Sequence, residues 1–370
     1  MKLCVVAPNH NTYSETFIHA HMNHLPGVTI NLVGDGAYFP KRELQGQEIY
    51  QPTIFHKLVK FMPGQLINNM QNQALVNFFK RKKIDVVLAE YGPTACAVLE
   101  ACQMAKIPLV AHFHGYDAFQ YSTAKQYHDN NQELFRKSKR LIAASKSMAS
   151  QLCLLGASAD KISVNHYGVD VKKFTGGSPS TAPPHFVAIG RFVEKKAPQL
   201  TVLAFQKVLK RVPEARLTMI GDGPLFEACK QIVHALNLEK QIALLGAKTP
   251  TEIIQELQRS RAFVQHSLRT SGGDSESLGV VFLEAGAMGL PAIGTRHDGI
   301  PEVILDGQTG LLADEGNIDE FADHMITLAQ DPALAKTLGD TAHERIKSHF
   351  SEEISLTGLW NILTDVVKNS

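Results

Sequence analysis

The sequence is poor in several features that mark common classes of protein. It has five cysteines in 370 residues and no Cys-x-x-Cys pair, which argues against a disulfide framework and favours buried free thiols in a reducing compartment. The opening MKLCVVAP lacks the long apolar core and the cleavage site of a signal peptide. No run reaches the roughly 18 apolar residues of a membrane span. We therefore predict a cytoplasmic protein.

The net charge of +1 is small and argues against a dedicated nucleic-acid-binding protein. It is unevenly distributed, because residues 1–184 hold 19 Lys and Arg against 12 Asp and Glu, whereas the rest hold 18 against 24. Two halves of opposite sign suggest two different partners. The composition, with 44% hydrophobic residues, is that of a globular protein, and the length is about twice that of a common domain.

Short β-rich runs alternate with longer helical patterns along the whole chain, which predicts an α/β fold with parallel sheets covered on both faces. The expected strands are 2–7, 28–33, 84–89, 108–112, 140–144, 161–165, 185–190, 215–221, 241–246, 262–267, 291–294 and 310–312. The pattern pauses at TGGSPSTAPP, a linker-like segment. We predict two doubly wound, Rossmann-like domains at 1–174 and 185–350, joined by the linker 175–184. An amphipathic helix follows at 351–370, and we expect it to pack against one of the two domains.

A glycine-bearing loop at 271–279 leads into an apolar helical run over 280–288. Free N–H groups and the positive end of the helix dipole at such a junction suit a phosphate group, and an ordinary helix cap is the alternative. Glu276 and Glu284 are eight residues apart, or roughly 12 Å along one helix. That is too far for the ~5 Å carboxylate pair of a retaining glycosidase. We expect Glu276 on the loop and Glu284 in the helix, each bound to a different part of a hydroxyl-rich ligand.

Two more groups of polar residues follow predicted strands, where ligands bind to open α/β sheets. Arg191 and Lys196 could clamp a diphosphate, although a solvated charged loop has the same composition. His112, His114 and Asp117 resemble a metal site, but the sequence offers no HExxH motif, no DxD motif and no second spaced histidine pair. We therefore expect hydrogen-bonding groups and no metal. A nicotinamide-dependent oxidoreductase is disfavoured because GxGxxG does not follow the first strand.

Together these motifs resemble the retaining glycosyltransferases of the group 1 family, or family 4, which have the GT-B fold. Glu276 and Glu284 match the family's E-x7-E motif, and GRxxxxKG appears with Ala197 in place of the last glycine. The GRxxxxKG element is carried by Gly190, Arg191 and Lys196. The signature EAxAxGxPxxxTxxxGxPE starts at Glu284 and continues with Ala285, Ala287, Gly289, Pro291, Thr295, Gly299, Pro301 and Glu302. The element VxxxGVDxxxF is carried by Val164, Gly168, Val169, Asp170 and Phe174. SETFI at 14–18 and HFHGYD at 112–117 are similar to bacterial exopolysaccharide and colanic-acid-type transferases.

The chain departs from the family's pattern at two places. Many relatives carry EGFG where this chain has ESLG at 276–279, which reduces the flexibility of that loop. Many also have a GG pair in the first N-terminal loop, where this chain reads PNHNTYSETF.

The resemblance implies that the two domains face each other across a cleft and that a hexosyl unit moves from a UDP- or GDP-linked sugar to a glycan or lipid-linked acceptor. It implies no cofactor and no metal. The implied catalytic residues are His114, Arg191, Lys196 and Glu276. The implied donor-binding residues are Gly190, Ser277, Leu278, Gly279, Val280 and Glu284. The loop at Asn9, His10 and Asn11, together with Asp117, is expected to bind the acceptor.

Within that set, Arg191 and Lys196 would hold the diphosphate, Glu284 the ribose, and Glu276 and His114 the transferred sugar. A catalytically silent GT-B protein that binds a sugar nucleotide or a protein partner is the alternative, and the presence of all these side chains disfavours it. The segment 56–83 ends in four cations. It could lie on an anionic membrane surface, or it could be a core-facing helix with cations at its C-terminus.

Overall fold

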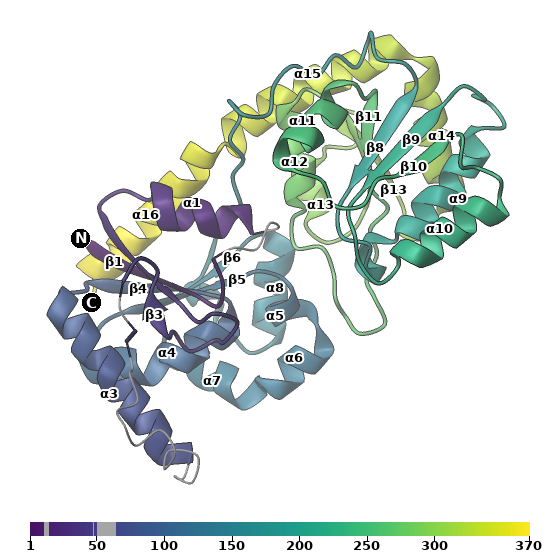
Figure 1. Cartoon of the computed structure of the whole chain (residues 1–370). Coiled ribbons are helices and arrows are strands. Elements are labelled where there is room, and N and C mark those ends of the chain that lie inside the picture. Colours follow the sequence, from purple (N-terminus) through teal and green to yellow (C-terminus); the bar gives the residue numbers. More distant parts are fainter. Residues whose placement is uncertain (11–14, 47, 50–63) are drawn as a thin grey trace. The chain divides into compact units, whose positions relative to one another are not determined.

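The computed structural model of the chain describes residues 1–10, 15–46, 48–49 and 64–370 (Figure 1). Contacts divide these residues into two compact units. Unit 1 comprises Met1–Asn165 and Ser355–Ser370, and unit 2 comprises His166–Ile354. Each unit is built around one sheet with helices, so the predicted fold class, two Rossmann-like domains, is confirmed.

The sheet of unit 1 has seven strands in the order β3-β2-β1-β4-β5-β6-β7. Its pairs are parallel except β2 with β3. The central strand β1 is almost entirely buried, as expected for a strand covered on both faces. The strands are β1 Lys2–Ala7, β2 Val28–Val33, β3 Arg42–Glu43, β4 Val86–Glu90, β5 Leu109–Phe113, β6 Arg140–Ala143 and β7 Ile162–Val164.

The helices of unit 1 follow the strands as the hydrophobic pattern predicts, with additional short helices between β5 and β6. They are α1 Thr16–His24, α3 Gly64–Lys82, α4 Gly92–Ala105, α5 Tyr116–Phe119, α6 Tyr121–Gln126, α7 His128–Lys137 and α8 Lys146–Leu154. All five cysteines are free, and Cys4 and Cys102 are buried, whereas Cys153 is exposed. The expectation of free thiols is met, although they are not all buried.

The sheet of unit 2 has six parallel strands in the order β10-β9-β8-β11-β12-β13. Helices α9, α10 and α14 cover one face, and α11, α12, α13 and α15 lie on the other (Figure 1). The strands are β8 His185–Ile189, β9 Arg216–Ile220, β10 Ile242–Leu244, β11 Ala262–Val264, β12 Ala292–Thr295 and β13 Gly310–Ala313. The helices are α9 Pro198–Val208, α10 Phe226–Ala235, α11 Pro250–Gln258, α12 Val280–Ala287, α13 Ile300–Val303, α14 Ile318–Gln330 and α15 Pro332–His349.

The boundary between the units lies earlier than the predicted boundary at residue 174. Hydrogen bonds fix the segment after Asn165 to unit 2: the Val169 N–H donates to the Phe350 carbonyl, and Glu352 donates back to Val169. His166 also contacts Glu302 at 2.9 Å. Polar pairing therefore holds this segment on unit 2, where the hydrophobic pattern placed it in the first domain.

The last helix, α16 Glu352–Lys368, contributes its residues from Ser355 onward to unit 1. Its Trp360 lies against Gly27, where an added Cβ atom would stand 2.8 Å from the indole ring. Gly27 also has φ = 86°, a conformation that favours glycine. A glycine at the end of the α1–β2 connection thus makes room for the single tryptophan.

The basic helix α3 covers the described part of the segment 56–83, and residues 56–63 lie outside the described residues. Its second half is packed in the core, with Leu75 and Phe79 at 0% exposure, whereas Leu66 and Met70 in its first half are exposed. Over the described residues, no helix combines the length and apolar character needed to cross a bilayer. The core-facing interpretation holds for the C-terminal half of α3.

Candidate active site

The predicted donor residues of unit 2 gather where β8 and β11 end. Gly190 and Arg191 follow β8, and a hollow at this edge is lined by both of them, by Lys196 and by Gln265. Lys196 forms an ion pair with Glu276, which belongs to the loop before α12. Two motifs that are 80 residues apart in the sequence are thus joined by one salt bridge.

The Lys196–Glu276 pair is largely buried, with side chains 15% and 11% exposed. Burial lowers the pKa of Lys196, and the Glu276 carboxylate partly offsets this effect. Burial also opposes ionisation of Glu276, but the charges of Lys196 and Lys195 lower its pKa below the usual value. The ion pair favours the charged form of both groups, and an anion that enters the hollow would compete with Glu276 for Lys196.

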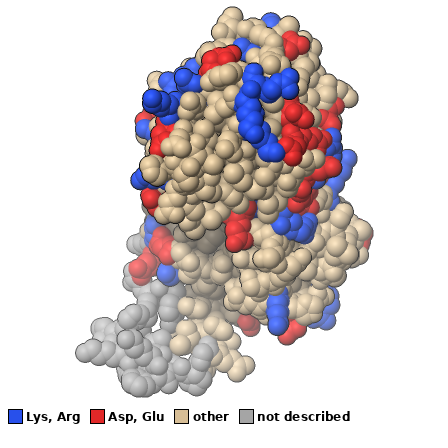
Figure 2. Space-filling model, turned by 90° about the vertical axis from the view of Figure 1, so that its right-hand side faces the viewer, with Lys and Arg blue, Asp and Glu red and all other residues tan. Residues whose placement is uncertain are grey.

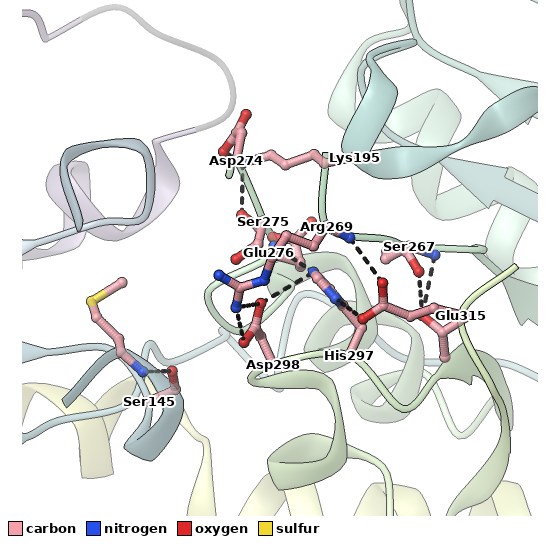
Figure 3. Close-up of polar contacts among 12 residues, drawn as sticks. Ser145, Lys195, Ser267, Arg269, Asp274, Ser275, Glu276, His297, Asp298 and Glu315 are labelled. Atoms are coloured by element: carbon pink, nitrogen blue, oxygen red, sulfur yellow. Dashed lines mark hydrogen bonds and ion pairs between the residues drawn. The ribbon is translucent and has the colours of Figure 1, made fainter. Parts of the chain in front are cut away.

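Lys195 contacts a different part of the loop than Lys196 does. Its ammonium group donates to Asp274 Oδ1 and to the Ser275 carbonyl, both at 3.0 Å, and so fastens the loop that carries Glu276 (Figure 3). Arg191 is exposed. Of the three cations in this segment, Arg191 and Lys196 are therefore the ones placed to meet a ligand.

Helix α12 begins where the loop ends, as predicted. Gly279 is its N-cap with φ = 80°, and an added Cβ atom would lie 2.6 Å from the Phe282 ring, so only glycine fits. Ser277 and Leu278 are buried before it, and Val280 starts the helix with its free N–H end. Leu278 is 0% exposed as a whole residue, so its side chain has no surface to offer a ligand.

Glu284 lies inside α12, one turn beyond Val280, and Glu276 lies on the loop, as the sequence predicts. Burial raises the pKa of Glu284 to about 7, and the charges of Lys173 and Lys196 oppose that rise. A buried carboxylate with a raised pKa that interacts with the charge of Lys196 is typical of a functional site.

A chain of hydrogen bonds that the sequence did not predict holds the same loop from its other side (Figure 3). The Glu276 N–H donates to His297 Nε2 at 3.0 Å, and His297 Nδ1 lies 2.6 Å from Glu315 Oε1. The second oxygen of Glu315 accepts the Arg269 N–H at 3.0 Å. The only signal in the sequence was the position of His297 after a strand.

In unit 1, three histidine side chains surround one buried carboxylate, that of Glu90. Glu90, at the end of β4, lies 2.8 Å from His21 Nδ1, 2.7 Å from His114 Nε2 and 3.4 Å from His112 Nδ1. Burial opposes ionisation of Glu90, but the charge of His21 and the histidine hydrogen bonds hold its pKa well below the usual range. Burial lowers the pKa of His114 to about 3, so that imidazole is neutral.

This cluster changes the expectation for His114. Its side chain is 1% exposed and stacks on Phe17 at a centroid distance of 4.7 Å. It lies inside unit 1, and a contact with a sugar would require the ring to be uncovered. His21, Glu90 and His112 also offer ligand atoms within 4.8 Å of one another, a set that could hold a metal ion.

Asp117 is also buried, at 1% exposure. Its carboxylate accepts the N–H groups of Gly92, His114 and Gly115 at 2.9–3.0 Å. These bonds favour the charged form, but burial outweighs them and raises the pKa to about 6. Asp117 thus holds the loops after β4 and β5 together. Its carboxylate is buried, so it offers no exposed oxygen for the predicted contact with the acceptor.

The loop predicted to bind the acceptor follows β1. Asn9 and His10 are half-buried there. Asn11 lies outside the described residues.

Two family models match successive parts of the chain. The model described as Glycosyltransferase Family 4 matches residues 26–173, and the model described as Glycosyl transferases group 1 matches residues 172–345. The second match contains both the Lys196–Glu276 pair and helix α12.

Curated relatives agree with these matches. The chain is 26% identical over 274 residues to the putative colanic acid biosynthesis glycosyltransferase WcaL of Salmonella typhimurium. The aligned region covers 73% of this chain and 68% of that protein. It is 27% identical over 283 residues to the amylovoran biosynthesis glycosyltransferase AmsK of Erwinia amylovora, covering 75% and 70%.

Solved structures share the fold at low identity. HepE of Anabaena in complex with UDP superposes with a TM-score of 0.79 at 16% identity, covering 99% of this chain and 100% of that one. A glycosyltransferase of Rickettsia africae gives 0.76 at 19% identity, covering 100% and 99%. This likeness shows the GT-B fold. The two family matches, which together span residues 26–345, and the curated relatives identify the chain as a glycosyltransferase of the family 4 type.

Proposed function

We propose that this glycosyltransferase moves a hexosyl unit from a nucleotide-diphosphate sugar to a hydroxyl group of a glycan or lipid-linked acceptor, with retention of the anomeric configuration. The observation that carries the proposal is the convergence of Arg191, Lys196, Glu276, Glu284 and the N-terminus of α12 on one edge of unit 2. Two cations and a helix N-terminus suit a diphosphate, and two separated carboxylates suit the hydroxyl groups on either side of it.

The Lys196–Glu276 salt bridge supports a definite order of events at the donor. A diphosphate that reaches Lys196 releases the Glu276 carboxylate, which then becomes an acceptor for the hydroxyl groups of the transferred sugar. Glu284 binds the ribose hydroxyls through its ionised form. The cations stabilise the negative charge that develops on the departing nucleotide.

The transfer needs no protein nucleophile. The bond between the anomeric carbon and the diphosphate oxygen breaks, and the acceptor oxygen bonds to the same face of that carbon. The departing phosphate oxygen takes the proton of the acceptor hydroxyl, so the charges balance without a metal or a cofactor. Glu276 lies on the loop before α12 in an ion pair with Lys196, and Glu284 lies inside the helix, so the proposal gives each carboxylate a binding role and neither the role of a nucleophile.

The relatives named for colanic acid and amylovoran biosynthesis support a role in bacterial surface polysaccharide synthesis. HepE, solved with UDP, supports UDP as the first nucleotide to test, with GDP beside it. We place the acceptor on unit 1, where the loops after β1, β4 and β5 meet at one edge of the sheet. A place at the inner face of the cytoplasmic membrane is part of this proposal.

The decisive experiment is a screen of UDP- and GDP-linked hexoses with the purified chain, followed by NMR of the released or transferred sugar. We expect one donor to be consumed and the new anomeric proton to keep the coupling constant of the donor. Inversion of configuration would overturn the retaining mechanism. Stabilisation by a sugar nucleotide without turnover, with a range of hydroxyl acceptors present, would favour the silent binding protein instead.

A further inference from the structure

His297 is the centre of a hydrogen-bond chain that ends at the proposed donor site. It lies two residues after β12 and its side chain is 1% exposed. On one side it meets the backbone of Glu276, and on the other the carboxylate of Glu315. It touches neither Lys196 nor the hollow beside it, so its place in the site is indirect.

The donors and acceptors in this series of hydrogen bonds determine which nitrogen of the His297 ring carries the proton. The Glu276 N–H is a donor, so His297 Nε2 must accept and carries no proton. The single proton of the neutral imidazole is therefore on Nδ1, from which it is donated to Glu315 Oε1. Asp298 Oδ2 also lies 3.5 Å from Nε2, but the Asp298 carboxylate accepts two closer bonds from Arg269. A proton on Nε2 would bring it face to face with the Glu276 N–H in a buried place.

Glu315 is itself held in place. Its second oxygen accepts the Arg269 N–H, and the Arg269 guanidinium forms two bonds of 2.8 and 2.9 Å with Asp298, the neighbour of His297. The next residue, Gly316, donates its N–H to His266 Nε2 at 2.9 Å. Loops after β11, β12 and β13 are thereby tied to one another around the ring.

The loop that carries Glu276 packs against the segment after β12 that contains His297 and Gly299. An added Cβ atom at Gly299 would lie 1.9 Å from the Ser277 carbonyl oxygen. From the other side, Lys195 fastens the Ser275 carbonyl. The peptide unit between Ser275 and Glu276 is thus fixed by Lys195 at its oxygen and by His297 at its N–H.

We propose that His297 and Glu315 are positioning residues for the donor site: Glu315 selects the His297 ring form with an unprotonated Nε2, and that nitrogen holds the Glu276 backbone where its carboxylate can bind the transferred sugar and release Lys196 to the diphosphate. This inference rests on the proposed function. The two can fail separately, because the ring form is measurable without any ligand.

Two substitutions at one position separate positioning from packing. In His297→Gln, the side-chain oxygen reaches about as far as Nε2 and can still accept the Glu276 N–H. In His297→Asn, the shorter amide reaches only as far as Nδ1, so it can serve Glu315 but not Glu276. His343→Asn is the matched control, because His343 Nδ1 donates to the Ala287 carbonyl at 2.7 Å, at the other end of α12.

The measurement is the dissociation constant for UDP, with GDP in parallel, by calorimetry, alongside the melting temperature of each variant. We expect His297→Asn to weaken binding about tenfold, the size of one lost buried hydrogen bond, with His297→Gln closer to wild type and His343→Asn within about twofold. Wild-type affinity in His297→Asn, or equal losses in the Asn and Gln variants, would overturn the proposal.

A spectrum of the unliganded protein tests the ring form and also serves if an Asn or Gln variant does not fold. In ¹⁵N-histidine-labelled wild type, we expect the His297 Nε2 resonance to be that of an unprotonated nitrogen and Nδ1 that of a protonated one. In Glu315→Gln, we expect the two forms to mix, because the amide can donate to Nδ1. A protonated Nε2 in wild type would overturn the proposal, whereas failure of wild type to bind either nucleotide would instead overturn the proposed function.

Discussion

Replacement of Glu284 by glutamine should stabilise unit 2 at alkaline pH while weakening nucleotide binding. Burial raises the pKa of Glu284 from its ordinary 4.5 to about 7. The folded chain therefore binds this proton more tightly than the unfolded chain does. The free energy of unfolding then falls as the pH rises from 4.5 to about 7, and it stays low above that.

The difference between these two pKa values corresponds to about 3 kcal/mol, which is an upper bound because Glu284 keeps partial exposure. Glu284→Gln removes the charge and should recover up to that amount at pH 8 and almost nothing at pH 4.5. For a unit of this size, a gain of about 3 kcal/mol raises the melting temperature by about 6–12 °C.

Scanning calorimetry of wild type and Glu284→Gln at several pH values between 4.5 and 8 measures this directly. The control is Glu227→Gln, because the Glu227 side chain on α10 is 71% exposed and the same chemical change there should leave the melting temperature constant. UDP affinity should fall in Glu284→Gln alone. A shift that is independent of pH, or a destabilised Glu284→Gln variant at pH 8, would refute the burial argument.

Three further outcomes follow from the described contacts. Lys196→Ala should lower kcat at least tenfold while far-ultraviolet circular dichroism stays unchanged, and wild-type turnover would remove Lys196 from the donor site. Glu90→Ala leaves three imidazoles without their shared carboxylate and should cost about 3–5 kcal/mol in chemical denaturation, so a loss under 1 kcal/mol would contradict the cluster. Reversal of the exposed charges at 80, 81 and 83 should abolish flotation with anionic vesicles if α3 docks there, and flotation that does not respond to the reversal would exclude that contact.

The fold was largely predictable from the sequence because both sheets are parallel and buried on both faces. Such strands show as continuous apolar runs, and every parallel strand was predicted to within two residues at each end except β11, whose predicted range 262–267 runs three residues past Val264. The edge strand β3 was missed, because Arg42 and Glu43 are polar and form only a two-residue pairing with β2 at the edge of the sheet. The contact-based boundary after residue 165 lies earlier than the predicted domain end at 174, because hydrogen bonds and the His166–Glu302 contact hold residues after 165 on unit 2.

The candidate site was predictable only as far as its motifs are local. Spacing placed Glu276 on a loop and Glu284 in a helix, and the structure agrees. The burial of His114 and Asp117 could not be predicted, since it depends on which loops close over the end of the unit 1 sheet. His297 and Glu315 gave no periodic signal, because their partnership joins loops after two different strands.

Strained backbone conformations occur at the same sheet edges as the candidate functional side chains. Seven non-glycine residues among those described have positive φ, and three of them, Lys83, Lys106 and Asn237, follow helices, where left-handed caps are common. Three others, Asp35, Tyr91 and Asp298, come after strands, and Ala197 joins the 3₁₀ turn Glu194–Lys196 to helix α9. Because a left-handed conformation costs an alanine or a tyrosine about 1–2 kcal/mol, it persists only where the surrounding packing enforces it.

Ala197 turns the chain so that Lys196 points back to Glu276, and Asp298 places Arg269 beside Glu315. Ala197→Gly would relieve the strain but also remove a buried methyl group, which contributes about 0.8 kcal/mol, so the free energy of unfolding should change by less than about 1 kcal/mol. The more informative readout is UDP affinity. If the turn exists to aim Lys196, added backbone freedom should weaken binding while stability hardly changes, and unchanged affinity would show that the turn serves folding alone.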